Sequence, residues 1–163
     1  MTLAEAIAAV KTGETITFLA DIDEDVTIKQ VKNVKFTIDG ANYKYYGTMT
    51  VNGTGYAGAQ GQALTIKNVN FVATSGSTCI NLGVSGNNNT RYTNNVTVSG
   101  CTFTDGDYTA VAVKSYTGGD KNLVIKDCIA TGMHSLAQLS NVKEGLVISG
   151  CDVDTKNGLN LGS

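Results

Sequence analysis

The feature of this 163-residue chain that most restricts its fold is a segment that repeats without gaps. Four copies begin at residues 64, 96, 123 and 146; the first runs from Leu64 to Phe71 and the second from Val96 to Phe103. Residues 36–40 fit as an earlier copy, and Ile16–Phe18 begins another. The period is about 23 to 32 residues, and regular copies separated by loops of variable length are typical of a solenoid.

A second apolar segment follows each copy at a nearly constant distance of about 13 to 16 residues. These segments are Met49–Val51, Ile80–Leu82, Val111–Val113, Ala137–Leu139 and Leu159–Leu161. Apolar residues alternate with polar ones in both sets, as expected for strands that bury one face. We predict two or three short strands in each turn of chain, each paired in parallel with its equivalent one turn later.

These repeats predict an all-β protein, namely a right-handed single-stranded parallel β-helix of about five to six coils. A left-handed β-helix requires a stricter six-residue rhythm, and a leucine-rich repeat requires a consensus that this chain lacks. An immunoglobulin-like sandwich would not place equivalent residues in columns.

The first 13 residues predict a helix that caps the solenoid. Thr2 and Glu5 have the spacing of a capping box, and Leu3, Ile7 and Val10 share one apolar face. Gly13 is expected to stop the helix, with Lys11 in its last turn. We therefore expect one domain over residues 1–163, with the capping helix at 1–13 and the coils at 14–163.

The other end of the predicted solenoid has no cap in the sequence. The last turn would expose apolar residues at its edge, and such edges template pairing with other chains. These residues are Leu146, Ile148, Leu159 and Leu161. We expect either a fragment of a longer protein or self-association through this uncapped C-terminal coil.

The capping helix, the segments at 14–22 and 26–28, and the four repeats together resemble the right-handed parallel β-helix, or pectin-lyase-like, superfamily. The resemblance covers essentially the whole chain. Within this superfamily, the chain is similar to repeat modules of bacterial secreted and surface proteins. It implies an extracellular or cell-surface location. It also implies a non-catalytic role as adhesin, spacer or carbohydrate-binding surface, with a polysaccharide or host-surface glycan as partner.

The same resemblance implies an alternative function, a polysaccharide lyase or glycoside hydrolase that acts on acidic, pectin-like glycans. Asp105 and Asp107 precede the segment Val111–Ser115 as paired acids precede a strand in polygalacturonases, and His134 lies near that family's histidine motif. The cationic pair that would bind a uronate is replaced by Leu159–Leu161. Because catalysis by paired carboxylates also needs groups that hold the substrate, we favour the non-catalytic module.

A pectate-lyase mechanism would need a Ca²⁺ site together with an Arg or Lys base. Asp21, Asp23 and Asp25 alternate on one side of the chain and are candidate Ca²⁺ ligands, although a solvated acidic turn has the same pattern. The single arginine, Arg91, lies far from them in sequence.

Tyrosines are concentrated in the predicted loops, at positions 43, 45, 46, 56, 92, 108 and 116. An exposed tyrosine ring can stack on a sugar ring, so Tyr92, Tyr108 and Tyr116, together with Arg91, are candidate ligand-binding residues. The alternative is that these rings fill gaps between the loops and the core.

Three of the four cysteines, Cys101, Cys128 and Cys151, occupy the repeat position that Val69 fills one turn earlier. The valine indicates a buried apolar position, and parallel Cβ directions on adjacent strands suit a disulfide poorly. We expect a ladder of free thiols, with Cys79 free as well.

Composition excludes some partners. The formal net charge is −2 and no basic patch is present, so nucleic acid is not expected as a partner. No apolar run approaches the roughly 18 residues of a membrane span, and Met1 is followed at once by the capped helix rather than by a signal peptide.

Overall fold

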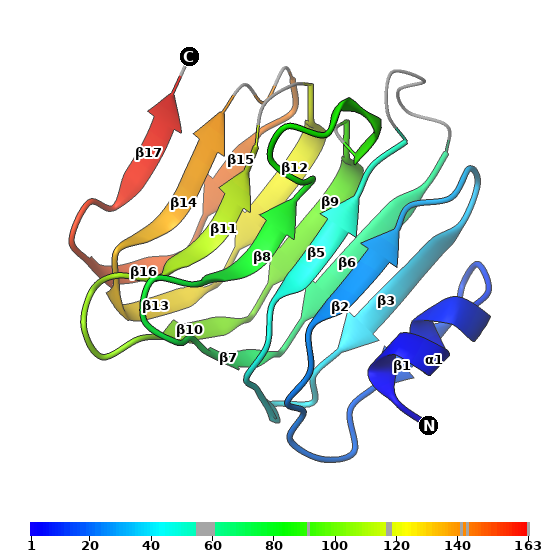
Figure 1. Cartoon of the computed structure of the whole chain (residues 1–163), viewed down its shortest axis with the longest axis horizontal. Helices are drawn as coiled ribbons and strands as arrows, with labels where there is room; N and C mark the ends of the chain where they lie inside the picture. The colour runs from blue at the N-terminus through cyan, green and yellow to red at the C-terminus, as the bar shows by residue number, and fades with distance from the viewer. Residues whose placement is uncertain (55–60, 91, 117–118, 141, 143, 163) are drawn as a thin grey trace.

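The computed structural model describes residues 1–54, 61–90, 92–116, 119–140, 142 and 144–162. In this part of the chain, one short α-helix, α1 (Leu3–Ala9), and a single 3₁₀ turn (Asn88–Thr90) accompany β-strands that form three parallel sheets (Figure 1). The predicted all-β class with parallel pairing is therefore confirmed. The three sheets remain open, each running from a first to a last strand.

Each sheet collects one strand from each turn of chain, except that the first turn contributes to sheet B only an isolated bridge between Ile22 and Tyr45. Sheet A contains β1 (Thr15–Thr17), β3 (Lys35–Asp39), β6 (Ala63–Lys67), β9 (Asn94–Ser99), β12 (Lys121–Lys126) and β15 (Val147–Ser149). Sheet B contains β4 (Lys44–Tyr45), β7 (Asn70–Val72), β10 (Thr102–Thr104), β13 (Ile129–Met133) and β16 (Asp152–Thr155). Sheet C contains β2 (Val26–Lys29), β5 (Met49–Asn52), β8 (Thr78–Leu82), β11 (Val111–Ser115), β14 (Ser135–Ser140) and β17 (Leu159–Gly162).

The strand register confirms the repeat alignment in sheet A. Leu64 is paired with Val96, which is paired in turn with Leu123, and the copy at residue 36 pairs Phe36 with Leu64. The first copy is displaced by two residues from our expectation, because Ile16 pairs with Ile38 rather than with Phe36. Alternation is unchanged by a shift of two residues, so the inward face is the same in either register.

Each repeated segment bends in its middle and so contributes to two sheets. The bend is made by Asn68, Gly100, Asp127 and Gly150, which share one repeat position and have φ of 53°, 60°, 54° and 63°. Glycine, asparagine and aspartate are the residues that adopt this left-handed conformation most readily. This residue choice explains why strands of sheet A turn into strands of sheet B at the same point in successive turns.

In sheet C the expected alignment is wrong for one strand. Ile80 and Leu82 pair with Val113 and Ser115, so Val111 lies two residues outside the predicted register. Ser115 is consequently buried among apolar residues. Its hydroxyl donates to the Ser140 carbonyl at 3.2 Å and accepts the Ser140 N–H at 2.8 Å, which satisfies the polar group inside the fold.

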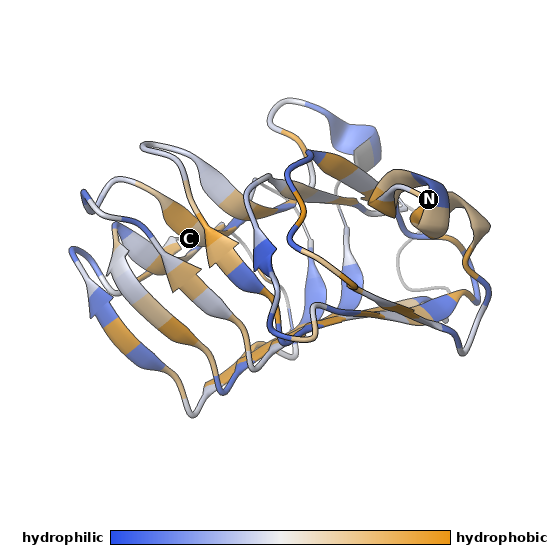
Figure 2. Ribbon diagram, turned by 90° about the horizontal axis from the view of Figure 1, so that it is seen from below, coloured by the Kyte–Doolittle hydropathy of each residue, from blue (hydrophilic) through white to orange (hydrophobic). Residues whose placement is uncertain are grey.

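The three sheets enclose one apolar core, and hydrophobic and hydrophilic residues alternate along the strands (Figure 2). A column of aromatic rings starts at Phe18, directly after β1, and continues through sheet B: Phe18 to Tyr45 at 6.1 Å, Tyr45 to Phe71 at 5.5 Å, and Phe71 to Phe103 at 5.0 Å between centroids. The loop position predicted for Tyr45 is wrong. Its ring is fully buried, and its hydroxyl donates to the Glu24 carbonyl at 2.5 Å.

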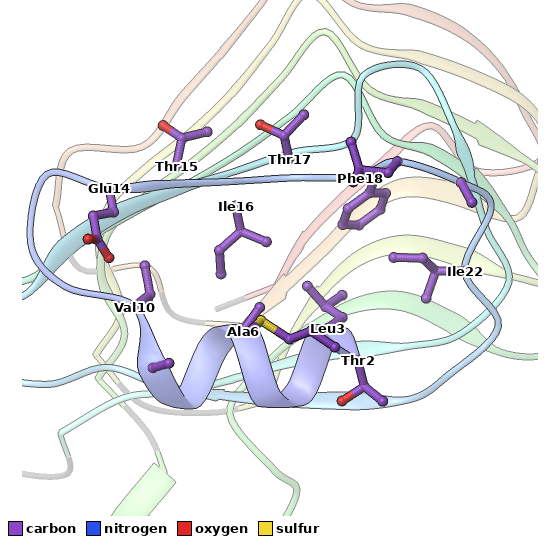
Figure 3. A pocket seen from close by; sticks show the side chains of 14 residues that line it. Thr2, Leu3, Ala6, Val10, Glu14, Thr15, Ile16, Thr17, Phe18 and Ile22 are labelled. Carbon is purple, nitrogen blue, oxygen red and sulfur yellow. The ribbon is translucent and has the colours of Figure 1, made fainter.

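The helix α1 begins as predicted and ends earlier. The capping box of Thr2 and Glu5 is present, and Leu3 is buried while Ile7 and Val10 pack against the core; Figure 3 shows Leu3 and Val10 on the side of the helix that faces β1. The expected end at Gly13 is wrong, because Val10 already has extended backbone. The Glu14 carboxylate accepts the Lys11 N–H at 2.7 Å and holds a turn where the helix would continue.

The ends of the chain lie at opposite ends of the stack of strands, with α1 beside the first turn (Figure 1). No helix in the described residues is long and apolar enough to cross a membrane.

Candidate functional site

Apart from Asp21, which lies beside the start of β4, the candidate catalytic and metal-binding residues lie along one edge of the molecule, which we call the B–C corner. It consists of the connections from sheet B strands to sheet C strands, at residues 46–48, 73–77, 105–110, 134 and 156–158, with 23–25 as the first-turn equivalent. Hydrogen bonds link neighbouring turns along this corner. Thr48 Oγ1 donates to the Thr78 carbonyl at 2.7 Å, and the Gly76 N–H donates to Thr109 Oγ1 at 2.7 Å.

Asp105 holds the largest of these connections in place. Its Oδ1 accepts the Gly106 N–H at 2.7 Å, and its Oδ2 accepts the N–H groups of Thr109 at 3.0 Å and Ala110 at 2.8 Å. Partial burial acts to raise the pKa of Asp105, but the hydrogen bonds outweigh it and lower the pKa to about 2. A carboxylate held as an anion by the backbone is suited to fixing a loop and poorly suited to donating a proton.

Asp107 lies on the same loop and is also engaged locally. Thr109 Oγ1 donates to Asp107 Oδ1 at 2.6 Å. The next residue, Tyr108, donates its hydroxyl to the Asp154 carboxylate at 3.1 Å, which joins the loop to β16 two turns of chain later. The structure therefore brings Asp105 and Asp107 together around one threonine hydroxyl.

His134 lies at the bend between β13 and β14. Its Nδ1 meets the Ser135 hydroxyl at 3.1 Å and the Gln138 amide at 3.2 Å, and its Nε2 meets the Asn157 amide at 3.0 Å. Within the described part of the chain, neither ring nitrogen is hydrogen-bonded to a carboxylate, so the usual orienting partner of a catalytic base is missing there.

The acidic segment at the start of the corner has its side chains arranged as alternation predicts. Asp21, Asp23 and Asp25 are all exposed, but Asp21 accepts the Lys44 N–H at 2.8 Å and Asp25 accepts the Thr48 N–H at 2.7 Å. Among the described residues, no group of three His, Cys, Asp or Glu side chains is placed to hold a metal ion. Asp21, Asp23 and Asp25 therefore do not converge as a Ca²⁺ site in this structure.

A polar groove of about 390 Å³ lies on the first three turns of the B–C corner. Its walls are Asp23, Glu24, Asp25, Tyr46, Gly47, Thr48, Ala73, Thr74 and Ser77. A Cβ at Gly47 would overlap the Glu24 carbonyl, so only glycine allows these two turns to approach so closely. We did not predict this groove from the sequence. The signal for it was Tyr46-Gly47-Thr48, an aromatic residue and a glycine at a connection between strands.

The candidate ligand-binding tyrosines do not form one surface. Tyr92 and Tyr116 lie on connections from sheet C to sheet A, whereas Tyr108 lies on the B–C corner. Tyr92 packs against Gly119, where a Cβ would overlap its ring, and Lys114 Nζ lies 4.9 Å from the centre of the Tyr116 ring. Arg91 and Tyr56 lie outside the described residues.

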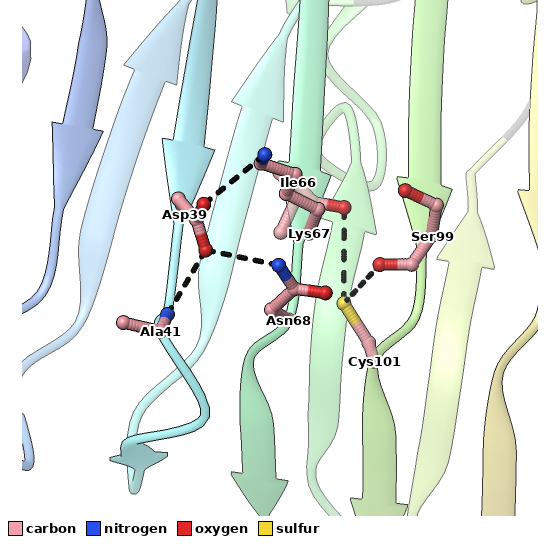
Figure 4. Close-up of polar contacts among 7 residues, drawn as sticks. All are labelled: Asp39, Ala41, Ile66, Lys67, Asn68, Ser99 and Cys101. Atoms are coloured by element: carbon pink, nitrogen blue, oxygen red, sulfur yellow. Dashed lines mark hydrogen bonds and ion pairs between the residues drawn. The ribbon is translucent and has the colours of Figure 1, made fainter.

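All four cysteines are free. In the predicted ladder, each sulfur faces the carbonyl two residues before it, at 3.5 Å for Cys101, 3.2 Å for Cys128 and 3.4 Å for Cys151. Figure 4 shows Cys101 beside the network in which Asp39 pairs with Lys67 at 3.1 Å and accepts from Asn68. The neighbouring Cys128 thiol and burial both raise the pKa of Cys101 well above its usual value.

No protein-family model, curated protein or solved structure matches this chain.

Proposed function

We propose that the three parallel sheets form a right-handed parallel β-helix of six turns, whose role is to display a carbohydrate-binding groove. Parallel strands joined by a crossover within one sheet are almost always connected in the right-handed sense, which supports that hand. The six strands of sheet A supply one strand for each turn.

The observation that carries the functional proposal is the groove at the B–C corner. Its volume of about 390 Å³ lies within the range of small-ligand sites. Tyr46 is 40% exposed at its wall and offers a ring face on which the C–H face of a sugar can stack. The hydroxyls of Thr74 and Ser77 and the carboxylate of Asp23 offer hydrogen bonds to sugar hydroxyls.

The charge of the groove indicates which sugars would bind. Asp23, Glu24 and Asp25 line it, with the Glu24 carboxylate accepting the Leu3 N–H at 2.7 Å, and no Lys, Arg or His is among the described lining residues. A uronate would be repelled there, whereas a neutral sugar or an amino sugar would not. The groove therefore supports binding of neutral or amino glycans in preference to the acidic, pectin-like glycans of the alternative function.

The proposal is a non-catalytic module because the acids that catalysis would use are engaged elsewhere. Asp105 is bound through both oxygens to backbone N–H groups, and Asp107 is bound to the Thr109 hydroxyl. A glycan-binding module of this kind would act as an adhesin or spacer in an extracellular or cell-surface setting, where polysaccharides are accessible.

Binding of the protein to an array of neutral, amino and acidic glycans tests the proposal. For the best ligand, Tyr46→Ala is expected to weaken binding by about tenfold, the size of one lost stacking contact. Tyr43→Ala is the matched control, because Tyr43 is 39% exposed, lies three residues away and does not line the groove. EDTA should leave affinity unchanged.

Two results would contradict the proposal. One is equal affinity of the Tyr46→Ala and Tyr43→Ala variants for every glycan that binds. The other is turnover of polygalacturonate that disappears in Asp105→Asn, which would favour the lyase or hydrolase.

A further inference from the structure

Three cysteines, Cys101, Cys128 and Cys151, form one column through successive turns, which we call the cysteine column. The N–H of Ile129, which follows Cys128, donates to the Cys101 carbonyl at 3.0 Å. The N–H of Asp152, which follows Cys151, donates to the Cys128 carbonyl at 2.9 Å. Each cysteine therefore lies directly beside its equivalent in the next turn, at the ordinary strand spacing of about 4.8 Å.

The three sulfur atoms point in the same direction. Each sulfur faces the carbonyl two residues before it and also one carbonyl of the preceding turn (Figure 4 shows both contacts of Cys101). The contacts with the preceding turn are Cys101 to Ile66 at 3.7 Å, Cys128 to Val98 at 3.7 Å and Cys151 to Ile125 at 3.8 Å. Because the same contacts recur, adjacent sulfurs are offset by about one strand spacing.

This offset suits a bridging metal ion and does not suit a disulfide, whose sulfur–sulfur bond is only about 2.05 Å long. A metal–thiolate bond is about 2.3 Å long, so an ion midway between two thiolates holds their sulfurs about 4.6 Å apart. That separation is close to the strand spacing of about 4.8 Å. The ion lies on the line between the two sulfurs, across both Cβ–Sγ bonds, and therefore needs no cavity.

The arrangement also restricts which ion fits. Among the described residues, no group of three His, Cys, Asp or Glu side chains is placed to hold one ion. The column therefore does not supply the three or four ligands that zinc takes from a protein. Adjacent pairs remain, and thiolates are the soft ligands that favour copper(I). Copper(I) and silver(I) both accept two thiolates in line.

We propose that Cys128, together with either Cys101 or Cys151, binds one soft two-coordinate cation of the copper(I) class between the two sulfurs. Binding forms two metal–sulfur bonds, releases two thiol protons and leaves the oxidation state of the ion unchanged. A hydrogen bond from the Cys101 thiol lowers the pKa of Cys128 and outweighs burial, so the shared ligand forms a thiolate readily. The proposal goes beyond glycan binding and does not depend on it.

Silver(I) is the probe, because it has the charge and ligand preference of copper(I) and needs no reducing agent. The full chain is refolded from urea with one equivalent of silver(I), since Cys101 and Cys128 are buried in the folded protein. An excess of 2-mercaptoethanol then competes for the ion. Native mass spectrometry should find one ion retained per chain, and X-ray absorption should find two sulfur neighbours around it.

Three valine variants locate the site, because Val69 fills the same column position and is fully buried there. Cys128→Val should weaken retention by at least about 100-fold, since two-point attachment is lost. The remaining thiols are then two turns apart, at about 9.6 Å, which one ion cannot bridge. Cys101→Val and Cys151→Val each leave an adjacent pair and should retain the ion as the native protein does. Cys79→Ala is the control, because it removes a buried thiol outside the column.

Three outcomes would overturn the proposal. The first is a native protein that loses the ion to 2-mercaptoethanol, and the second is equal retention by Cys128→Val and the native protein. The third is a loss in Cys101→Val, Cys151→Val or Cys79→Ala as large as that in Cys128→Val. Far-ultraviolet circular dichroism and the urea midpoint check that the variants fold, and the corresponding serine variants give the same comparison if valine impairs folding.

Discussion

Gly132 lies directly against the backbone carbonyl of Asp105, so that a Cβ at Gly132 would overlap that oxygen. Gly132 also has φ of 67°, and it interrupts the pairing of β13 with β16 between Thr131 and Met133. Its carbonyl accepts the Tyr108 N–H at 2.9 Å. The glycine therefore brings β13 close enough to hold the 105–110 connection.

We expect Gly132→Ala to lower the free energy of unfolding by at least about 2 kcal/mol. The cost of placing alanine in the left-handed conformation adds to the cost of its clash with the main chain. Gly106→Ala is the control on the same connection, since Gly106 lacks positive φ and a methyl group there would have no atom within 4 Å. Urea denaturation gives both values. Equal midpoints for the two variants would show that the close approach of Gly132 to the Asp105 carbonyl does not contribute to stability.

Asp105 should make stability depend on pH in the acid range. Its pKa is lowered from 3.8 to about 2, so the folded protein binds this proton more weakly than the unfolded chain does. The stabilisation is fully present above the unfolded pKa and is lost as pH falls from about 4 towards about 2. Urea midpoints measured across this range should fall in the native protein and fall less steeply in Asp105→Asn.

The control for this pH series is Asp152→Asn, which neutralises an exposed carboxylate on β16. It should keep the pH dependence of the native protein. If Asp105→Asn and Asp152→Asn have the same slope, the hydrogen bonds to Asp105 do not carry the effect.

The ring stack in sheet B predicts a large loss of stability when Phe103 is truncated. Phe103 is fully buried, and its ring lies 5.0 Å from that of Phe71 with an angle of 10° between the planes. Phe103→Ala should cost about 3–5 kcal/mol, from lost burial and the cavity that remains. Phe103→Leu should cost about 1.5 kcal/mol or less, because it keeps most of the apolar volume.

The midpoint and slope of urea denaturation separate these two variants. A cost for Phe103→Ala no larger than that for Phe103→Leu would mean that the column relaxes to fill the space, against the packing of these rings in the structure.

The columns of inward residues could be predicted from the sequence because two patterns identify them: apolar and polar residues alternate along each strand, and the same segment repeats in successive turns. Leu64, Val96 and Leu123 are apolar at one repeat position, and the sheet A register follows directly from their alignment. The bend at Asn68 and Gly100 was also readable, since both residue types tolerate positive φ, although we predicted no bend there.

The register of β11 could not be obtained in this way. A shift of two residues leaves the alternation of Val111 and Val113 unchanged, so hydrophobic pattern cannot choose between the two alignments. In the structure, the Asp105 carboxylate binds the N–H groups of Thr109 and Ala110 directly before β11 begins at Val111, and the hydrophobic pattern does not reveal this contact. The groove beside Tyr46 could not be predicted either, because its walls come from three turns that are far apart in the sequence.

The cysteines give the last prediction. Cys79, Cys101 and Cys128 are buried, whereas Cys151 is only partly buried on the last turn. Burial and the charge of Asp105 raise the pKa of Cys79 to about 12, so its reactive thiolate is scarce at neutral pH. In the folded protein, Cys151 should react with a water-soluble disulfide reagent well before the other three.

Thiol titration without a reducing agent checks this in two steps. In native buffer about one thiol per chain should react quickly, and in denaturant all four should react, because unfolding exposes the three buried thiols. Cys151→Ser should remove the fast phase and leave three thiols in denaturant. A deficit of two thiols in the denatured native-sequence protein would reveal a disulfide and contradict the free ladder of Cys101, Cys128 and Cys151.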